Sequence, residues 1–120
     1  MDISFHVLDA DHLVRVDAAG KVDLSASLRA ANEIAAFQAA DAILLDARKL
    51  QGRLSILEIV ELVKSLVAQA ERYKRKLAIL VRGDDQLERA RFLETYSRNR
   101  GIPIAAFVDY EEAVRWLHAP

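Results

Sequence analysis

The chain has 120 residues, of which 52% are hydrophobic and 29% charged, a composition typical of one globular domain with its own core. Seventeen basic and 18 acidic residues leave a formal net charge of −1, so no strong field draws the chain to nucleic acid or to an anionic membrane. The absence of cysteine excludes a disulfide framework, a thiolate nucleophile and a Cys-ligated metal. No signal peptide and no apolar stretch of membrane-spanning length is evident, and we expect a cytoplasmic protein.

Hydrophobic periodicity and capping residues predict two opening strands and then an alternation of helix and strand. Ile3, Phe5 and Val7 occupy alternate positions and predict the first strand. Leu13 to Val16 predict a second strand, antiparallel to the first because residues 9–11 leave room only for a short turn. The other strands are predicted over residues 42–46, 77–81 and 104–108, and the helices over about residues 23–39, 55–72, 84–100 and 109–117.

This order of elements predicts an α/β fold in which residues 1–120 form a single domain. The sheet is expected to be five-stranded and mixed, with about four helices. Strands two to five are expected to be largely parallel, because each helical connection is long enough for a right-handed crossover. No linker, repeat or low-complexity segment interrupts the pattern.

Four runs of sequence carry a resemblance to a known family: ILLDARKLQG at residues 43–52, KLAILV at 76–81, RNRGIPIAAFVD at 98–109 and YEEAVRWL at 110–117. With the order of elements, they resemble the SpoIIAA-like branch of the STAS families (sulfate transporter and anti-sigma factor antagonist) over almost the whole chain. The resemblance implies a STAS-like fold and a small binding or regulatory domain.

Ser55 opens the helix after the central strand, and two roles are open to it. With Glu58 three residues on, its hydroxyl predicts a capping box. In STAS anti-sigma antagonists a serine at this place, counted from the aspartate at position 46, is phosphorylated within an Asp-Ser-x-Gly motif. Here Leu54 and Leu57 stand where that motif has Asp and Gly. We therefore favour the cap and keep Ser55 as a phosphorylation candidate.

Acidic residues follow three of the predicted strands. Asp46, Asp84 and Asp109 lie at strand ends, where open α/β sheets receive ligands and partners. Three such carboxylates could hold a hard cation such as Mg²⁺. Asp84 and Asp109 are already explained as helix caps, however, and the three histidines lack metal-ligand spacing, so we assign no metal and no cofactor.

Basic residues occupy the same predicted loops. Arg48, Arg53 and Arg82, together with two helix N-termini, could line a pocket for a phosphate or carboxylate. No phosphate-cradling glycine motif accompanies them. The densest basic run, residues 72–76, is expected to be a solvated connection and not a nucleic-acid site.

Candidate partner surfaces lie on the second and third helices. Leu57 falls off the apolar arc of its helix, among Glu61 and Lys64. Phe92 and Tyr96 fall away from the inner stripe of the third helix, and an exposed aromatic beside arginines is typical of a partner surface.

The hypothesis that these observations favour is a non-enzymatic binding or regulatory module that contacts another protein or a second copy of itself. One alternative is a domain that binds a small anionic or lipid-like ligand. Another is a degenerate anti-sigma-antagonist phosphoswitch at Ser55. No acid, base and nucleophile can be assembled from the sequence, so we assign no catalytic residue.

Overall fold

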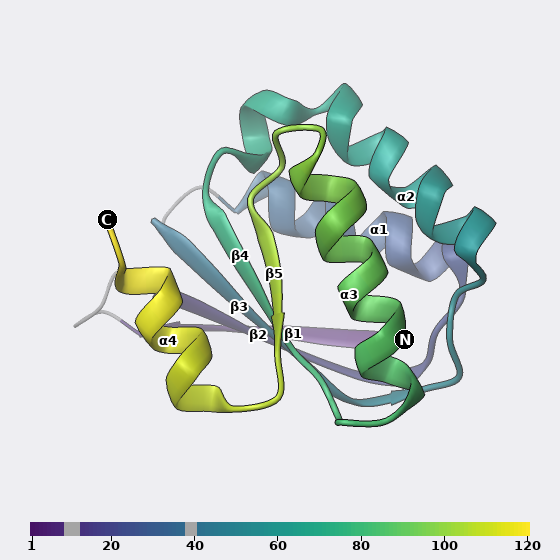
Figure 1. The fold of residues 1–120 in the computed structure, drawn as a ribbon, viewed down its shortest axis with the longest axis horizontal. Helices are drawn as coiled ribbons and strands as arrows, with labels where there is room; N and C mark the ends of the chain where they lie inside the picture. The colour runs from purple at the N-terminus through teal and green to yellow at the C-terminus, as the bar shows by residue number, and fades with distance from the viewer. Residues whose placement is uncertain (9–12, 38–40) are drawn as a thin grey trace.

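The computed structural model describes residues 1–8, 13–37 and 41–120, which form one mixed sheet with helices on both faces (Figure 1). The strands are β1 (Asp2–Leu8), β2 (Leu13–Lys21), β3 (Ala42–Gln51), β4 (Lys76–Leu80) and β5 (Ile104–Phe107). The helices are α1 (Leu24–Ala36), α2 (Ile56–Ala68), α3 (Asp85–Arg98) and α4 (Tyr110–His118), with a 3-10 turn, η2 (Ala70–Tyr73), after α2.

The strands lie in the sheet in chain order, β1-β2-β3-β4-β5. β1 pairs antiparallel with β2, and the other three pairings are parallel. Each helix that connects two neighbouring parallel strands makes a right-handed crossover. Because the strands are added to the sheet in chain order, these crossovers place their helices on the same face. Thus α1, α2 and α3 share one face, and α4, which follows the last strand, packs on the other against β3, β4 and β5 (Figure 1).

The single α/β domain with a five-stranded mixed sheet and four helices confirms the predicted fold class. The predicted turn at residues 9–11 and the predicted end of the first helix at Ala39 lie outside the described residues. Two strands are longer than predicted, and the first is the central strand, which does not end at Asp46 but continues to Gln51. Its extension pairs with the end of β2, which is itself longer than predicted and reaches Lys21.

Two residues of the basic run serve the ends of helices. The Arg75 guanidinium donates to the carbonyl oxygens of Ile34, in the last turn of α1, and of Phe37, its C-cap. The Lys76 ammonium donates to the carbonyls of Trp116 and Ala119 at the end of α4. Because cations are favoured at the negative ends of helices, both Arg75 and Lys76 stabilise the helix ends that they contact.

Within the described ranges, no helix is both long and apolar enough to cross a bilayer.

Candidate functional site

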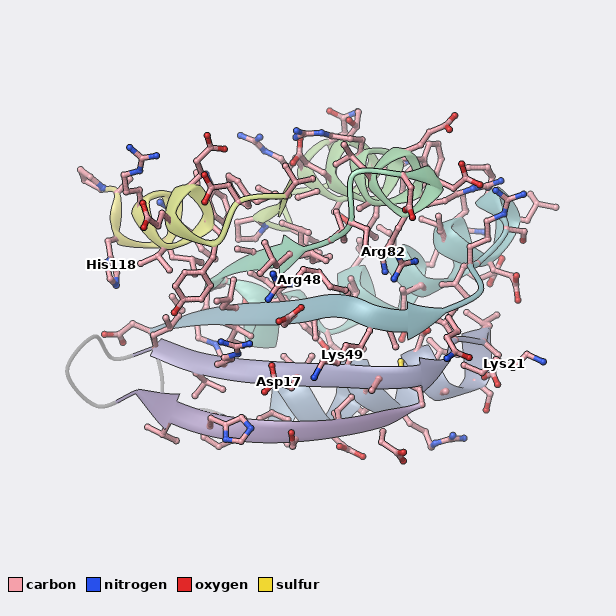
Figure 2. All side chains as sticks on the ribbon, turned by 90° about the horizontal axis from the view of Figure 1, so that it is seen from below. Asp17, Lys21, Arg48, Lys49, Arg82 and His118 are labelled. Carbon is pink, nitrogen blue, oxygen red and sulfur yellow. The ribbon has the colours of Figure 1, made fainter. Side chains whose placement is uncertain are left out.

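Helix α4 covers only part of its face of the sheet, and the rest carries polar side chains. Over β1 and β2 this open face holds His6, Arg15 and Asp17, with Asp46 and Arg48 following on β3. Figure 2 shows Asp17 and Lys49 on the near side of the strands, with α1 behind them. A half-covered sheet alternates apolar and polar positions in this way, because one face of each strand meets the core and the other meets water.

Asp46 is the centre of the network on this face, and its side chain is 8% exposed. One carboxylate oxygen accepts from Arg15 Nη2 at 2.9 Å and from Arg48 Nη2 at 2.8 Å. The other accepts from Arg48 Nε at 3.0 Å and from the Arg48 backbone amide at 3.1 Å. Arg15 also bonds Asp17 at 2.8 Å, and His6 Nε2 lies 3.2 Å from Asp17. The predicted strand-end acid is therefore saturated by arginines.

The charges of this network perturb one another's titration. Hydrogen bonds from Arg48, and then the positive charges of Arg48 and Arg15, hold the pKa of Asp46 below its usual range in spite of burial. The bond to Asp46 raises the pKa of Arg48, and the bond to Asp17 raises that of Arg15. Asp46 thus stays ionised at neutral pH as a structural anion, which makes it a poor general acid.

Arg82 stabilises the part of β3 that extends past its neighbour. β3 pairs with β4 only as far as Asp46 opposite Leu80, so the later carbonyls of β3 lack partners on that side. Arg82 Nη1 donates to the carbonyls of Arg48 and Leu50, and Gln86 Nε2 donates to the carbonyl of Ala47 at 2.6 Å. Side-chain donors take the place of a neighbouring strand for these three carbonyl groups.

The other predicted rim residues form separate local contacts. Asp84 caps α3. The hydrogen bond from the Gln86 amide, and to a smaller extent the one from the Arg82 side chain, lowers the pKa of its carboxyl group. Asp109 caps α4 by accepting from the Glu111 amide at 2.9 Å. Arg53 lies 3.2 Å from Asp85 in an exposed ion pair. Among the described residues, no group of three acidic or histidine side chains could hold a metal ion.

Ser55 forms the predicted capping box at the start of α2. Its hydroxyl accepts from the Glu58 amide at 3.1 Å, and the Glu58 carboxylate accepts from the Ser55 amide at 2.9 Å. The next two residues, Ile56 and Leu57, are 40% and 78% exposed. A fixed helix start therefore presents two apolar side chains to solvent beside the phosphorylation candidate.

Phe92 and Tyr96 of α3 pack against residues at the start of α2. Their rings stack at 5.8 Å between centroids, and both are half-buried against the cluster of Leu54, Ile59 and Val63. The guanidinium of Arg100 covers the Tyr96 ring at 3.4 Å. Both aromatic side chains thus join α3 to α2 and leave only part of their surface free.

Sequence reasoning did not find a cavity of about 190 Å³ between the sheet and helices α1, α2 and α3. Its walls are almost wholly apolar, but Arg53, Gln86 and Arg89 also line it. The one local signal is small side chains on the inner helix faces, namely Ala30, Ala31 and Ala90. Alanine is also an ordinary helix former, so this signal does not distinguish a cavity from close packing.

Structural comparison decides the fold type. The chain is similar to an uncharacterized DUF3478-family protein with a SpoIIAA-like fold from Shewanella loihica PV-4, with a TM-score of 0.60, 21% identity, and coverage of 97% of this chain and 92% of that one. The fold is SpoIIAA-like. An anti-sigma factor antagonist from Mycobacterium paratuberculosis is similar at a TM-score of 0.60 and 18% identity, covering 98% of this chain and 96% of that chain. No protein-family model matches the sequence, and no curated protein matches it.

These similarities confirm the STAS-like fold that the resemblance implied. At these identities they concern the SpoIIAA-like architecture and not the chemistry at any one residue.

Proposed function

We propose that this chain is a non-enzymatic regulatory module that acts by contacting another protein through the first turn of α2. The observation that carries the proposal is the 78% exposure of Leu57, next to Ile56 and two residues from Ser55. Covering a leucine side chain is worth about 1.5–3 kcal/mol. Leu57 thus retains most of that free energy for a contact outside the fold.

The charges on this surface favour a specific contact over nonspecific association. Exposed charges follow Leu57 along the helix: Glu58 in the cap, and Glu61 and Lys64, which lie 3.5 Å apart. Protein interfaces commonly combine a small apolar centre with a charged rim that fixes orientation. The similarity to an anti-sigma factor antagonist, a regulatory protein by its name, supports a role of this class.

Ser55 is the residue of this surface at which the contact could be regulated. Its side chain lies at the helix N-terminus, where added negative charge is favoured by the dipole. A phosphate there would also repel the Glu58 carboxylate, which accepts a hydrogen bond from the Ser55 amide. Modification would thus open the capping box and change the surface beside Leu57.

The test compares Leu57→Asp with Val108→Asp. Val108 is 50% exposed near α4, away from α2, so the control adds the same charge at another surface. We expect proteins of the source cell, or a second copy of the chain, to associate with the parent and with the Val108→Asp chain but not with the Leu57→Asp chain. Affinity capture with quantitative mass spectrometry measures the association with proteins of the source cell. Light scattering after size exclusion measures the association with a second copy of the chain.

Equal capture by all three chains would refute the surface. Loss of folding in Leu57→Asp, seen by circular dichroism, would show that Leu57 belongs to the core and would refute it as well. Ser55→Asp, in the same assay, tests regulation: binding equal to that of the parent would count against Ser55 as a switch.

A further inference from the structure

The cavity of about 190 Å³ lies within the domain, under the three helices that share one face of the sheet. Its presence is evident at Leu45, in the middle of the central strand. Leu45 faces the helices but is only partly buried, whereas Leu44, which faces α4 on the other side, is 0% exposed. Of these two neighbouring leucines, only the one that borders the cavity leaves accessible apolar surface.

Small residues of several elements border the cavity. Ala30 and Ala31 of α1, Ala47 of β3 and Ala90 of α3 all line it, where larger side chains would close the space. Larger side chains of both the helices and the sheet, such as Ile34, Leu66 and Ile79, complete the wall. Apolar walls of this kind favour apolar molecules, and an enclosed apolar cavity of about 150 Å³ binds benzene.

One end of the cavity is charged. Arg53, in the exposed segment between β3 and α2, lines this end together with Gln86 and Arg89 of α3. Gln86, Arg89, Ala90 and Leu93 are spaced along one face of α3, so the arginine belongs to the same surface as the apolar wall. Asp85 meets Arg53 in a pair that is mostly exposed, and such a pair exchanges readily for another anion.

We infer that this cavity binds a small monocarboxylic acid with an apolar body, whose carboxylate lies at Arg53 and Arg89. A body of about six to eight carbons is modestly larger than benzene and suits a cavity of this volume. Arginine binds carboxylates with paired hydrogen bonds, which fixes the orientation of the acid. This site is separate from the contact surface at Leu57, and either inference can fail without the other.

Octanoate, below its critical micelle concentration, is the probe for this site, with butyrate and 1-octanol as controls for length and charge. Titration calorimetry and methyl NMR of the parent chain give the affinity and the location. We expect octanoate to bind and to shift the methyl signals of Leu45, Ile79 and Leu93. Butyrate is expected to bind at least tenfold more weakly, because it leaves much of the cavity unfilled.

Variants separate the two parts of the site. Ala31→Leu and Ala90→Leu each add three carbons to the cavity wall, so a folded chain of either kind should lose at least tenfold in octanoate affinity. Arg89→Gln should weaken octanoate about tenfold but change octanol less than twofold, because only the charged head is affected. Leu57→Asp is the matched surface control and should bind octanoate as the parent does.

Failure of octanoate to bind the parent at millimolar concentration would overturn the proposal, and so would methyl shifts confined to the protein surface. Octanoate affinity unchanged by Arg89→Gln would overturn the role of the arginine end. If both alanine variants fail to fold, the methyl shifts of the parent still decide whether the cavity is occupied.

Discussion

Replacing Asp46 by asparagine tests the reasoning about the open sheet face most directly. Asparagine keeps the size of the side chain and one acceptor oxygen, so the two bonds from the Arg48 Nε and backbone amide can persist. The bonds from Arg15 Nη2 and Arg48 Nη2, however, would meet an amide NH2 group, which is itself a donor. The variant therefore loses two charge-assisted hydrogen bonds and the charge that neutralised two arginines.

The magnitude follows from those two bonds. Hydrogen bonds to charged groups contribute about 1.5–3 kcal/mol each, before allowance for water that replaces them. Arg15 and Arg48 are 33% and 46% exposed and regain solvation when Asp46 is changed. We expect Asp46→Asn to lower the free energy of unfolding by about 2–3 kcal/mol, which for a chain of this size lowers Tm by about 8–12 °C.

Urea denaturation followed by circular dichroism at neutral pH measures this difference. Asp17→Asn is the matched control: Asp17 also bonds Arg15, but its side chain is 40% exposed, so its loss should cost less than about 1 kcal/mol. An Asp46→Asn chain within about 0.5 kcal/mol of the parent would refute the argument that the buried carboxylate holds the strands together.

The same pair of chains predicts a pH dependence. Because the folded protein lowers the pKa of Asp46, the unfolded chain binds a proton at this residue more readily than the folded chain does. The stability from Asp46 is therefore fully present above the unfolded pKa of about 4, and it is lost as pH falls through the lower folded pKa. The difference between parent and Asp46→Asn should be constant near neutrality and shrink below about pH 4.

Two further substitutions test local devices. Ser55→Ala removes the cap of α2 and should cost about 1 kcal/mol in urea denaturation, whereas Ser55→Asp keeps a capping oxygen and should cost less; equal losses would contradict the capping role. The Glu94 carboxylate accepts from the amide of Ala106 at 2.7 Å on the edge strand β5, so Glu94→Ala should cost about 1–2 kcal/mol and expose that amide to hydrogen exchange. Glu94→Gln retains an acceptor oxygen and should keep the amide protected; loss of protection in this control would show that charge matters more than the bond.

Local patterns predicted the element types well, because each depends on residues close in sequence. The box at Ser55 and Glu58 and the caps at Asp84 and Asp109 lie within three residues of the amides that they bond. Alternation of apolar runs then determined the order of layers, and right-handed crossovers determined which helices share a face. These features need no knowledge of distant contacts.

The length of β3 could not be predicted in this way. Residues 47–51 contain Arg48, Lys49 and Gln51, a polar composition that predicts a loop when taken alone. In the fold, Lys49 to Gln51 pair with Ala19 to Lys21 of β2, and Arg82 binds carbonyls on the other side. The strand persists because of partners about 30 residues away on either side in sequence, and Asp46 consequently lies within a strand.

The cavity also depends on residues that are distant in sequence, because three helices and the sheet together line it. Ala31 and Ala90 are about 60 residues apart in sequence but line the same cavity. Neither residue indicates by itself that space remains between the helices and the sheet. On the other face of the sheet, α4 packs against Leu44 and Leu80, both 0% exposed. The same strands thus support close packing on one side, and the space on the other follows from the helix residues that face it.

The energetic consequence gives the cavity its significance. Apolar side chains that border an unfilled space lack packing contacts on one side. Replacing one of the lining alanines by leucine would fill part of that space and supply some of those contacts. A fold that retains alanine at positions 31 and 90 forgoes stability that a single substitution offers, and such departures from optimal packing are characteristic of functional sites. The apolar acid that we infer would fill the same volume, and its binding would add to the free energy of unfolding in proportion to its occupancy.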